Sequence, residues 1–488
     1  MAETSEIDDT GDMTFWSAVA VADRVGRRDV RAVEVVEAHL ARIAAVNGAL
    51  NAITLVDEGA LAEAEAVDVA VARAITEGHQ LPLAGVPVTI KDNTDVAGQS
   101  TPNGVPALNA TVADADAPLV ERLRAAGAVI IGRTNTPEFS WRWHTDNPLF
   151  GPTINPWDPG LTPGGSSGGA AAALAAGMGC LAHGNDAGGS VRWPANCTGI
   201  SAIRPTMGRI PSHNGTAPGE RPLGIELAAA QGAMGRSAAD VRLMLEVMAG
   251  EHWRDPSSVP ASFDAAHTKR AGWCLGAGGE PHSEVVAAVE GACGALVDAG
   301  WRVKPVAVPD LETSSRDWAT LINTDFHLTS RNTMLELGSP AIAAMLEVFD
   351  DVGPAVDLAG LYAVLARRAV QLREWQRLLS VEVDVVVLPV TMEPAWPAGD
   401  DTTSRRRLEQ IFTANTPLVA FNFLGLPAAA LPTSLTNGRP NGVQIVARRF
   451  AEGVALEAAA AIEGILGRFP SPPDPPHPDP ATPSPARE

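Results

Sequence analysis

The chain has 488 residues, of which 45% are hydrophobic and 19% charged, values typical of a globular protein with an extensive core. Its formal net charge of −21 argues against nucleic acid as a partner, because such binding depends on cationic contacts to phosphate. Composition and charge together favour an ordinary soluble enzyme.

Targeting signals and cysteine spacing bear on the compartment. The acidic segment MAETSEIDDTGDM lacks the basic and apolar blocks of a secretory signal, and no apolar run approaches the ~20 residues of a membrane helix. Four cysteines without a C-x-x-C pair fit neither a zinc site nor a disulfide framework. We therefore expect a cytoplasmic protein that does not bind a membrane.

Short apolar runs alternate with helical patterns along the chain. Helical periodicity is predicted for Phe15–Ala49, with a break at Gly26–Asp29, and for residues 57–77, 117–126, 240–249 and 285–297. Strand-like runs are Gly85–Ile90, Ala128–Ile131 and Val383–Leu388, and the first of these strands is expected to end at Lys91. This alternation predicts an α/β fold in which helices cover both faces of a mixed or largely parallel sheet.

Two segments interrupt this alternation. Residues 147–167 contain five prolines and end in a glycine-rich stretch, and residues 206–222 are polar and contain Gly and Pro. Long segments without regular structure are usually functional in a compact enzyme. From Phe469 onward the chain is rich in proline. We therefore expect one catalytic domain over 1–468 and a disordered tail over 469–488.

The segment Pro163-Gly-Gly-Ser-Ser-Gly-Gly-Ala170 leads into an Ala-rich helix and allows three interpretations. Gly165-x-Ser167-x-Gly169 matches the nucleophile elbow of α/β-hydrolases, but the apolar strand that should precede that motif is absent. A phosphate-binding loop at a helix N-terminus is the second, although Walker spacing and its lysine are missing. A glycine-rich helix start that only packs closely is the third, and this segment alone does not decide between packing and function.

A second serine and a lysine add to this signal. Ser190 follows Gly188 and Gly189, and adjacent glycines free the backbone to turn several N–H groups toward one point, which suits a developing oxyanion. Lys91 ends an apolar strand and is one of only three lysines in the chain. Taken alone, an ion-paired lysine beside Asp92 is the simpler interpretation.

These segments together resemble the three signature blocks of the amidase signature family. The blocks are Gly85-Val-Pro-Val-Thr-Ile-Lys-Asp92, Gly164-Gly-Ser-Ser-Gly-Gly169 and Asp186-Ala-Gly-Gly-Ser-Val-Arg192. Their order and spacing match: the two serines are 24 residues apart, and the lysine is 99 residues before the second serine. The resemblance runs from about Ser17 to Leu466. It implies the amidase-signature fold, a central mixed sheet covered by helices on both faces.

The resemblance assigns a catalytic role to three residues. Ser190 corresponds to the nucleophile, Ser166 to a relay that follows a cis peptide bond from Gly165, and Lys91 to the base. Lysine has an ordinary pKa of about 10.4, and burial beside serines lowers it. Neutral Lys91 then draws the proton of Ser190 through Ser166 and returns it to the leaving nitrogen. This chemistry needs no metal or cofactor.

The resemblance also implies an oxyanion hole and residues that support it. The oxyanion hole corresponds to the backbone N–H groups of Ala187, Gly188, Gly189 and Ser190. The supporting residues are Ser167, Asp186 and Arg192. A buried pair of Asp186 with Arg192 is expected to brace the nucleophile loop rather than to react.

The substrate is less well defined by the sequence. The segment Ser140-Trp-Arg-Trp143 aligns with positions that line the acyl channel in this family, so Ser140, Trp141 and Trp143 are expected to contact substrate. Met207 and Arg209 lie in the loop expected to cover the site, and they are also expected to contact substrate. The chain is similar to the bacterial amidases, aryl-acylamidases and urethanases of the family. This similarity implies a small-molecule amide or carbamate as substrate, cleaved at its C–N bond.

Two alternatives stay open. The family also includes the amidase subunit of a tRNA-dependent amidotransferase, which generates ammonia for a partner; the net charge and the aromatic residues weigh against it. A non-catalytic module that binds anions through the Gly164–Gly169 loop is the other. A homodimer is left open as the assembly.

Overall fold

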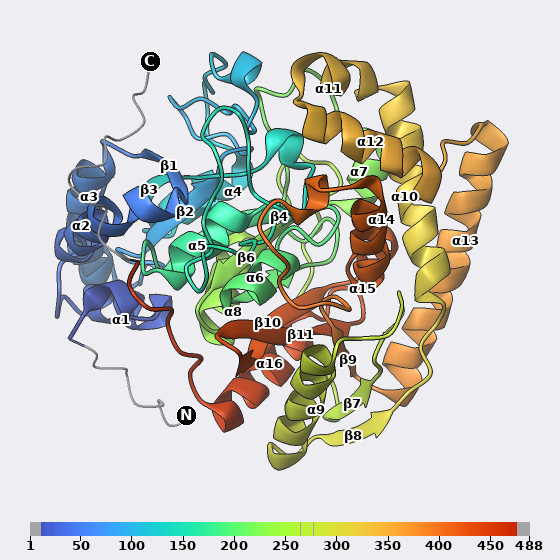
Figure 1. The fold of residues 1–488 in the computed structure, drawn as a ribbon. Coiled ribbons are helices and arrows are strands. Elements are labelled where there is room, and N and C mark those ends of the chain that lie inside the picture. Colours follow the sequence, from blue (N-terminus) through green and yellow to red (C-terminus); the bar gives the residue numbers. More distant parts are fainter. Residues whose placement is uncertain (1–10, 264, 277, 476–488) are drawn as a thin grey trace.

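A computed structural model describes residues 11–263, 265–276 and 278–475. Its described residues contain an 11-stranded sheet in the order β1-β3-β2-β4-β6-β5-β10-β11-β9-β7-β8. The strands are β1 Ile53–Val56, β2 Pro87–Lys91, β3 Val129–Thr134, β4 Leu181–Asp186, β5 Ser201–Arg204, β6 Ala230–Gly235, β7 Arg270–Trp273, β8 Arg302–Pro305, β9 Val385–Pro389, β10 Ala428–Thr436 and β11 Arg439–Ala447. The sheet runs across the molecule from β1 to β8 (Figure 1).

The sheet is mixed, as predicted. Strand β2 pairs in parallel with β3 and with β4, and β7 pairs in parallel with β8 and β9. The pairs β1–β3, β4–β6, β6–β5, β5–β10, β10–β11 and β11–β9 are antiparallel. Because β2 and β4 are parallel neighbours, their carboxyl ends lie at the same edge of the sheet, where ligands bind in open α/β sheets.

Sixteen α-helices are described, and they cover both faces of the sheet. They are α1 Ala18–Gly26, α2 Ala32–Leu50, α3 Ala60–Glu77, α4 Pro118–Ala125, α5 Gly168–Ala175, α6 Arg192–Thr198, α7 Leu223–Ala228, α8 Ala238–Met248, α9 Ser283–Asp298, α10 Leu311–Leu328, α11 Arg331–Leu337, α12 Pro340–Val352, α13 Leu358–Arg377, α14 Arg405–Ala414, α15 Thr416–Leu424 and α16 Glu452–Leu466. The predicted helices and strands of the chain are found within a few residues of their expected ends. Helices α6, α7 and α10 to α16, and all strands except β2, β3 and β9, were not predicted.

Side chains of successive strand residues enter two separate cores. In β9, Val385 and Val387 pack with helices α1 to α4, α8, α9 and α16, whereas Val386 and Leu388 pack with α6, α10, α12 to α15 and part of α5. Such alternation follows from the two-residue period of a strand. The second core contains most of the aromatic side chains and is the one that reaches the candidate site.

Both predicted irregular segments are found as loops. Residues 147–167 and 206–222 contain no helix or strand. Beyond α16, Phe469 packs edge-on against Trp157 with ring centroids 5.9 Å apart, and Asp474 pairs with Arg42 at 2.5 Å. The rest of the expected tail, residues 476–488, lies outside the described residues.

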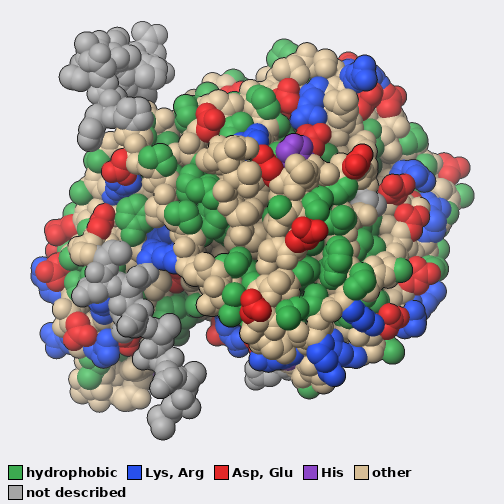
Figure 2. All heavy atoms as spheres, turned by 60° about the horizontal axis from the view of Figure 1, so that its bottom comes forward, with side chains coloured by type: hydrophobic (Ala, Val, Ile, Leu, Met, Phe, Trp, Pro, Cys, Tyr) green, Lys and Arg blue, Asp and Glu red, His purple; other side chains and the backbone are tan. Residues whose placement is uncertain are grey.

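The surface carries both signs of charge. The face drawn in Figure 2 shows acidic and basic side chains interspersed around hydrophobic and uncharged areas. Within the described part of the chain, no helix combines the length and apolarity needed to cross a membrane.

Candidate active site

Lys91 lies at the carboxyl end of β2, between β3 and β4, and is fully buried. Its Nζ lies 2.6 Å from Ser166 Oγ and 2.9 Å from Asn185 Oδ1. Asn185 is held in turn by Asn93, because the two amides exchange hydrogen bonds of 2.8 and 3.2 Å. The amine is thus fixed between one hydroxyl and one amide oxygen.

Burial changes the protonation of this amine. Desolvation lowers the pKa of Lys91 to about 7, against the opposing charges of Asp186 and Asp92. His183 is also fully buried, and burial lowers its pKa to about 3, so it stays neutral beside Lys91. At neutral pH a substantial fraction of Lys91 is therefore the uncharged amine, which can accept a proton.

Ser166 stands just before α5, after a cis peptide bond from Gly165, as predicted. The backbone here is crowded: a Cβ on Gly165 would lie 2.5 Å from the carbonyl oxygen of Arg142, and one on Gly164 would lie 2.5 Å from Pro194 Cα. Only glycine allows such an approach. Thr136 Oγ1 donates to the Ser166 carbonyl oxygen at 2.9 Å and fixes this residue further.

Ser190 lies in the loop between β4 and α6, which is held from below by a buried ion pair. Asp186 accepts from the backbone N–H of Gly189 at 2.7 Å and from Arg192 Nε at 3.0 Å. Asp186 and Arg192 are both fully buried. Burial raises the pKa of Asp186, but the Arg192 guanidinium outweighs this effect and holds the pKa well below its ordinary value. The expected bracing pair is present.

This ion pair gives a stability prediction. In Arg192→Met, Asp186 loses its cation inside the core, so the free energy of unfolding at pH 7 is expected to fall by about 3–5 kcal/mol. Urea denaturation followed by circular dichroism measures the change. The exposed pair of Arg73 with Glu77 is the control, and Arg73→Met should change stability little. Equal, small effects of both substitutions would contradict the bracing role.

The backbone donors expected to form an oxyanion hole are not equivalent. The N–H of Gly189 is already bonded to Asp186 Oδ1. Within the described residues, the N–H groups of Ala187, Gly188 and Ser190 have no protein acceptor. These three are the free donors of the loop.

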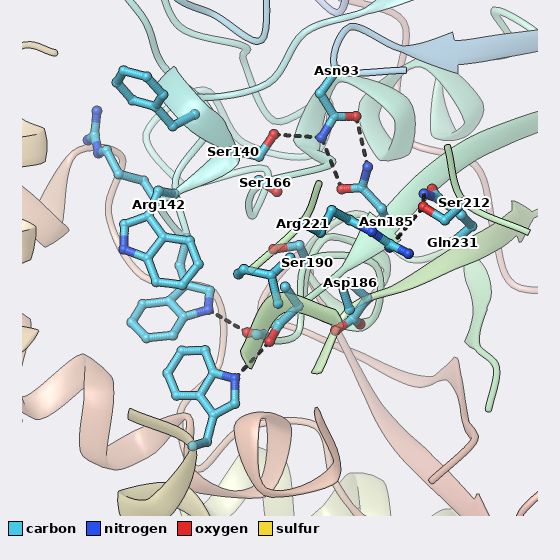
Figure 3. Close-up of a pocket in the computed structure, with 18 of the residues that line it drawn as sticks. Asn93, Ser140, Arg142, Ser166, Asn185, Asp186, Ser190, Ser212, Arg221 and Gln231 are labelled. Atoms are coloured by element: carbon cyan, nitrogen blue, oxygen red, sulfur yellow. Dashed lines mark hydrogen bonds between the residues drawn. The ribbon is translucent and has the colours of Figure 1, made fainter. Parts of the chain in front are cut away.

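A cavity opens above these residues, and both Ser166 and Ser190 line it. Indole rings stand on one side of the serines, and Asn93, Asn185 and Gln231 on the other (Figure 3). The apolar lining residues are Phe139, Trp141, Trp143, Ile225, Trp318, Met345 and Phe349. The polar and charged ones, apart from those at the serines, are Asn93, Ser140, Arg142, Asn185, Ser212, Asn214, Arg221 and Gln231. The cavity therefore suits a substrate with one aromatic end and one polar end.

Three of the five residues expected to contact substrate do line the cavity. Trp141 stacks against Trp318 with ring centroids 6.1 Å apart, and Trp143 is nearly fully buried in the same wall. Ser140 Oγ accepts from Asn93 Nδ2 at 2.8 Å and is one of the polar lining residues. Ser167, expected to support the site, is buried below it, and its Oγ has no hydrogen-bond partner among the described residues.

Met207 and Arg209 are not among the residues that line the cavity, so the expectation that they contact substrate needs correction. Arg209 is fully buried and its Nη2 pairs with Glu452 Oε2 at 2.6 Å. A buried guanidinium needs a carboxylate partner, and α16 supplies it inside the core. The later part of the same loop does reach the cavity, through Ser212, Asn214 and Arg221.

Sequence reasoning missed most of the cavity lining. Trp318 comes from α10, and Met345 and Phe349 come from α12, all more than 120 residues beyond Ser190. Their only sequence signal is the apolar face of an amphipathic helix, which does not say what that face covers. Among the described residues, no group of three or more His, Cys, Asp or Glu side chains is arranged to hold a metal ion.

Comparisons with known proteins show the family of the chain. Residues 34–456 match the family model described as Amidase. The chain is 42% identical to the indoleacetamide hydrolase of Bradyrhizobium diazoefficiens, over 94% of this chain and 88% of the relative. It is 32% identical to a glutamyl-tRNA(Gln) amidotransferase subunit of Nocardia farcinica, over 93% of this chain and 99% of that relative. A bacterial aryl acylamidase of solved structure superposes with a TM-score of 0.79 at 25% identity, covering 93% of this chain and 96% of that one.

Fold and site together define an amidase-signature enzyme, and the chain belongs to the amidase family. Within that family it is an amidohydrolase, an enzyme that hydrolyses amides.

Proposed function

We propose that Ser190 is the nucleophile, Ser166 the proton relay and Lys91 the base of this amidase. The observation that carries the proposal is the buried Lys91 amine, 2.6 Å from Ser166 Oγ, at the floor of a cavity that Ser190 also lines. A buried amine beside a hydroxyl, with a substantial neutral fraction at pH 7, is what a base for serine activation requires.

The proposed reaction proceeds through an acyl-enzyme. Ser166 passes its proton to Lys91 while it takes the proton of Ser190, whose Oγ attacks the amide carbon. The carbonyl oxygen becomes negative and is stabilised by the free N–H groups of the loop, those of Ala187, Gly188 and Ser190. When the tetrahedral intermediate collapses, the C–N bond breaks and the leaving nitrogen receives the proton through Ser166. Water then attacks the ester by the same relay.

We propose an aryl-substituted amide as the substrate class. The wall of Trp141, Trp143 and Trp318 offers flat aromatic surface, which favours a ring in the acyl group. Indole-3-acetamide is the first candidate, given the 42% identity to an indoleacetamide hydrolase over nearly the whole chain. Aryl carbamates present the same planar carbonyl and C–N bond, and they belong to the same proposal.

A panel of acetamide, indole-3-acetamide, an anilide, an aryl carbamate and an aryl ester tests this substrate class. The proposal predicts the highest kcat/KM for substrates with an aromatic acyl or carbamoyl group. Activity on acetamide that equals activity on indole-3-acetamide would contradict it. Co-purification with partner proteins and release of ammonia only from glutamine would instead favour the role of the amidotransferase relative, to which the chain is 32% identical.

The substitution Trp141→Ala tests whether the Trp141 ring contacts the substrate or only fills the core. Removing this ring takes away apolar contact worth about 25 cal/mol per Å² of buried surface. We expect kcat/KM for indole-3-acetamide to fall about 10- to 100-fold, and that for acetamide to fall less than about 3-fold. Steady-state kinetics on both substrates measure the difference. Equal losses would mean that Trp141 only fills the core.

A further inference from the structure

Two indole N–H groups hold the backbone of the nucleophile loop. Trp318 Nε1, on α10, donates to the carbonyl oxygen of Ala187 at 2.8 Å. Trp143 Nε1 donates to the carbonyl oxygen of Gly188 at 2.8 Å. In Figure 3, two dashed lines run from indole nitrogens to the loop that carries Ser190. The aromatic wall is thus bonded to two successive carbonyl groups shortly before the serine.

A carbonyl held in this way also fixes an N–H group. In a trans peptide, C=O and N–H point in opposite directions within one plane. When Trp318 holds the Ala187 carbonyl, it therefore sets the direction of the Gly188 N–H, one of the free donors of the loop. When Trp143 holds the Gly188 carbonyl, it sets the direction of the Gly189 N–H, which bonds to Asp186 Oδ1 at 2.7 Å.

Packing supports the same arrangement. A Cβ on Gly188 would lie 2.8 Å from Trp318 Cζ2, so the indole ring rests directly on this glycine. Gly189 has a φ of +96°, and a Cβ there would lie 2.8 Å from Leu418 Cδ1. Trp318 is 1% exposed, so protein atoms surround most of its ring. The loop is confined by contact as well as by hydrogen bonds.

We infer that Trp318 is a positioning residue that aligns the Gly188 oxyanion donor through its indole N–H, and that Trp143 steadies the same loop by holding the Gly188–Gly189 peptide, while both rings form the acyl wall. This inference rests on the proposed function, in which Ser190 is the nucleophile. The acyl pocket and the oxyanion hole then depend on the same side chains. An aromatic substrate that presses on the wall then stabilises the same rings that hold the loop.

Trp141 is a matched control in the same wall. Its ring stacks on Trp318 at 6.1 Å with an interplanar angle of 19°, and it lines the same cavity. Its Nε1, however, is buried without a hydrogen-bond partner among the described residues. Trp→Phe at either position replaces an indole of the wall by a smaller ring. Only the change at 318 also removes a hydrogen bond to the loop.

The test compares Trp318→Phe, Trp143→Phe and Trp141→Phe on indole-3-acetamide and on acetamide. Loss of donor alignment is expected to lower kcat about 10- to 100-fold in Trp318→Phe, for both substrates and with KM changed less than about 3-fold. Trp141→Phe alters the acyl wall but removes no bond to the loop, so its loss is expected mainly as a higher KM for indole-3-acetamide, with a smaller fall in kcat than in Trp318→Phe. Equal kcat in Trp318→Phe and Trp141→Phe, or a Trp318→Phe variant in which only KM rises, would overturn the inference.

A second measurement guards against misfolding of the Phe variants. Incorporation of 3-benzothienylalanine at 318 keeps the bicyclic shape of the ring and replaces the N–H by a sulfur atom, which cannot donate a hydrogen bond. The inference predicts the same fall in kcat as in Trp318→Phe, and unchanged kcat with this side chain would overturn it. Failure of the proposed function is distinguishable, because it would appear as activity retained in Ser190→Ala, whatever the tryptophan variants do.

Discussion

Ser190→Ala is expected to lower the rate of indole-3-acetamide hydrolysis by at least about 10⁴-fold, because no acyl-enzyme can form without the hydroxyl. The side chain is buried and the change removes one oxygen, so the melting temperature should stay within a few degrees of wild type. Single-turnover kinetics and a thermal melt on the same preparation check both parts.

Ser167→Ala is the control for this prediction. Its hydroxyl is buried next to the site and has no hydrogen-bond partner among the described residues, so its removal should keep most of the activity. If Ser167→Ala were inactive while Ser190→Ala stayed active, the nucleophile would be Ser167.

Substitution of Lys91 is expected to have the second largest effect. Its pKa of about 7 in the folded protein means that the base is protonated below pH 7 and neutral above it. The kcat/KM of wild type should therefore rise through pH 6–8 and level off at higher pH. Lys91→Met keeps an unbranched side chain of similar length in the buried site, and it should lose about 10³-fold or more of the activity and flatten this rise. A pH–rate profile that keeps its shape in Lys91→Met would remove Lys91 from the mechanism.

Asn185→Asp refines the same test without removing the lysine. It places a carboxylate where Asn185 Oδ1 now lies, 2.9 Å from Nζ. This negative charge adds to those of Asp92 and Asp186, which already raise the pKa of Lys91 against burial. The rise in kcat/KM should then move to higher pH. A rise that stays near pH 7 would indicate that another group titrates.

The floor of the site could be predicted from sequence because its constraints are local. At Gly165 the backbone passes so close to the Arg142 carbonyl that no Cβ fits, and at Ser190 two preceding glycines allow the sharp bend. Such requirements leave a pattern of glycines and serines at fixed spacing. Lys91 is assigned to the site only by the resemblance to the family, because the apolar run that ends at it, taken alone, favours an ion-paired lysine.

The walls of the site could not be predicted in the same way. Trp318 reaches Ala187 from α10, 131 residues further along the chain, and nothing near either residue specifies that contact. The expectation for Arg209 is wrong because of another long-range contact. Its loop does contribute to the cavity, but the guanidinium of Arg209 pairs with Glu452 inside the core. The proposed acyl wall depends on these long-range contacts, whereas the proposed serines depend on local backbone geometry.

Covalent labelling with a fluorophosphonate, followed by peptide mapping, tests directly whether Ser190 is the nucleophile. We expect a single adduct on Ser190, formed faster at pH 8 than at pH 6 because Lys91 must be neutral, and absent in Ser190→Ala. An adduct on Ser167 or on any other residue, or a labelling rate that is the same at both pH values and in Lys91→Met, would contradict this expectation.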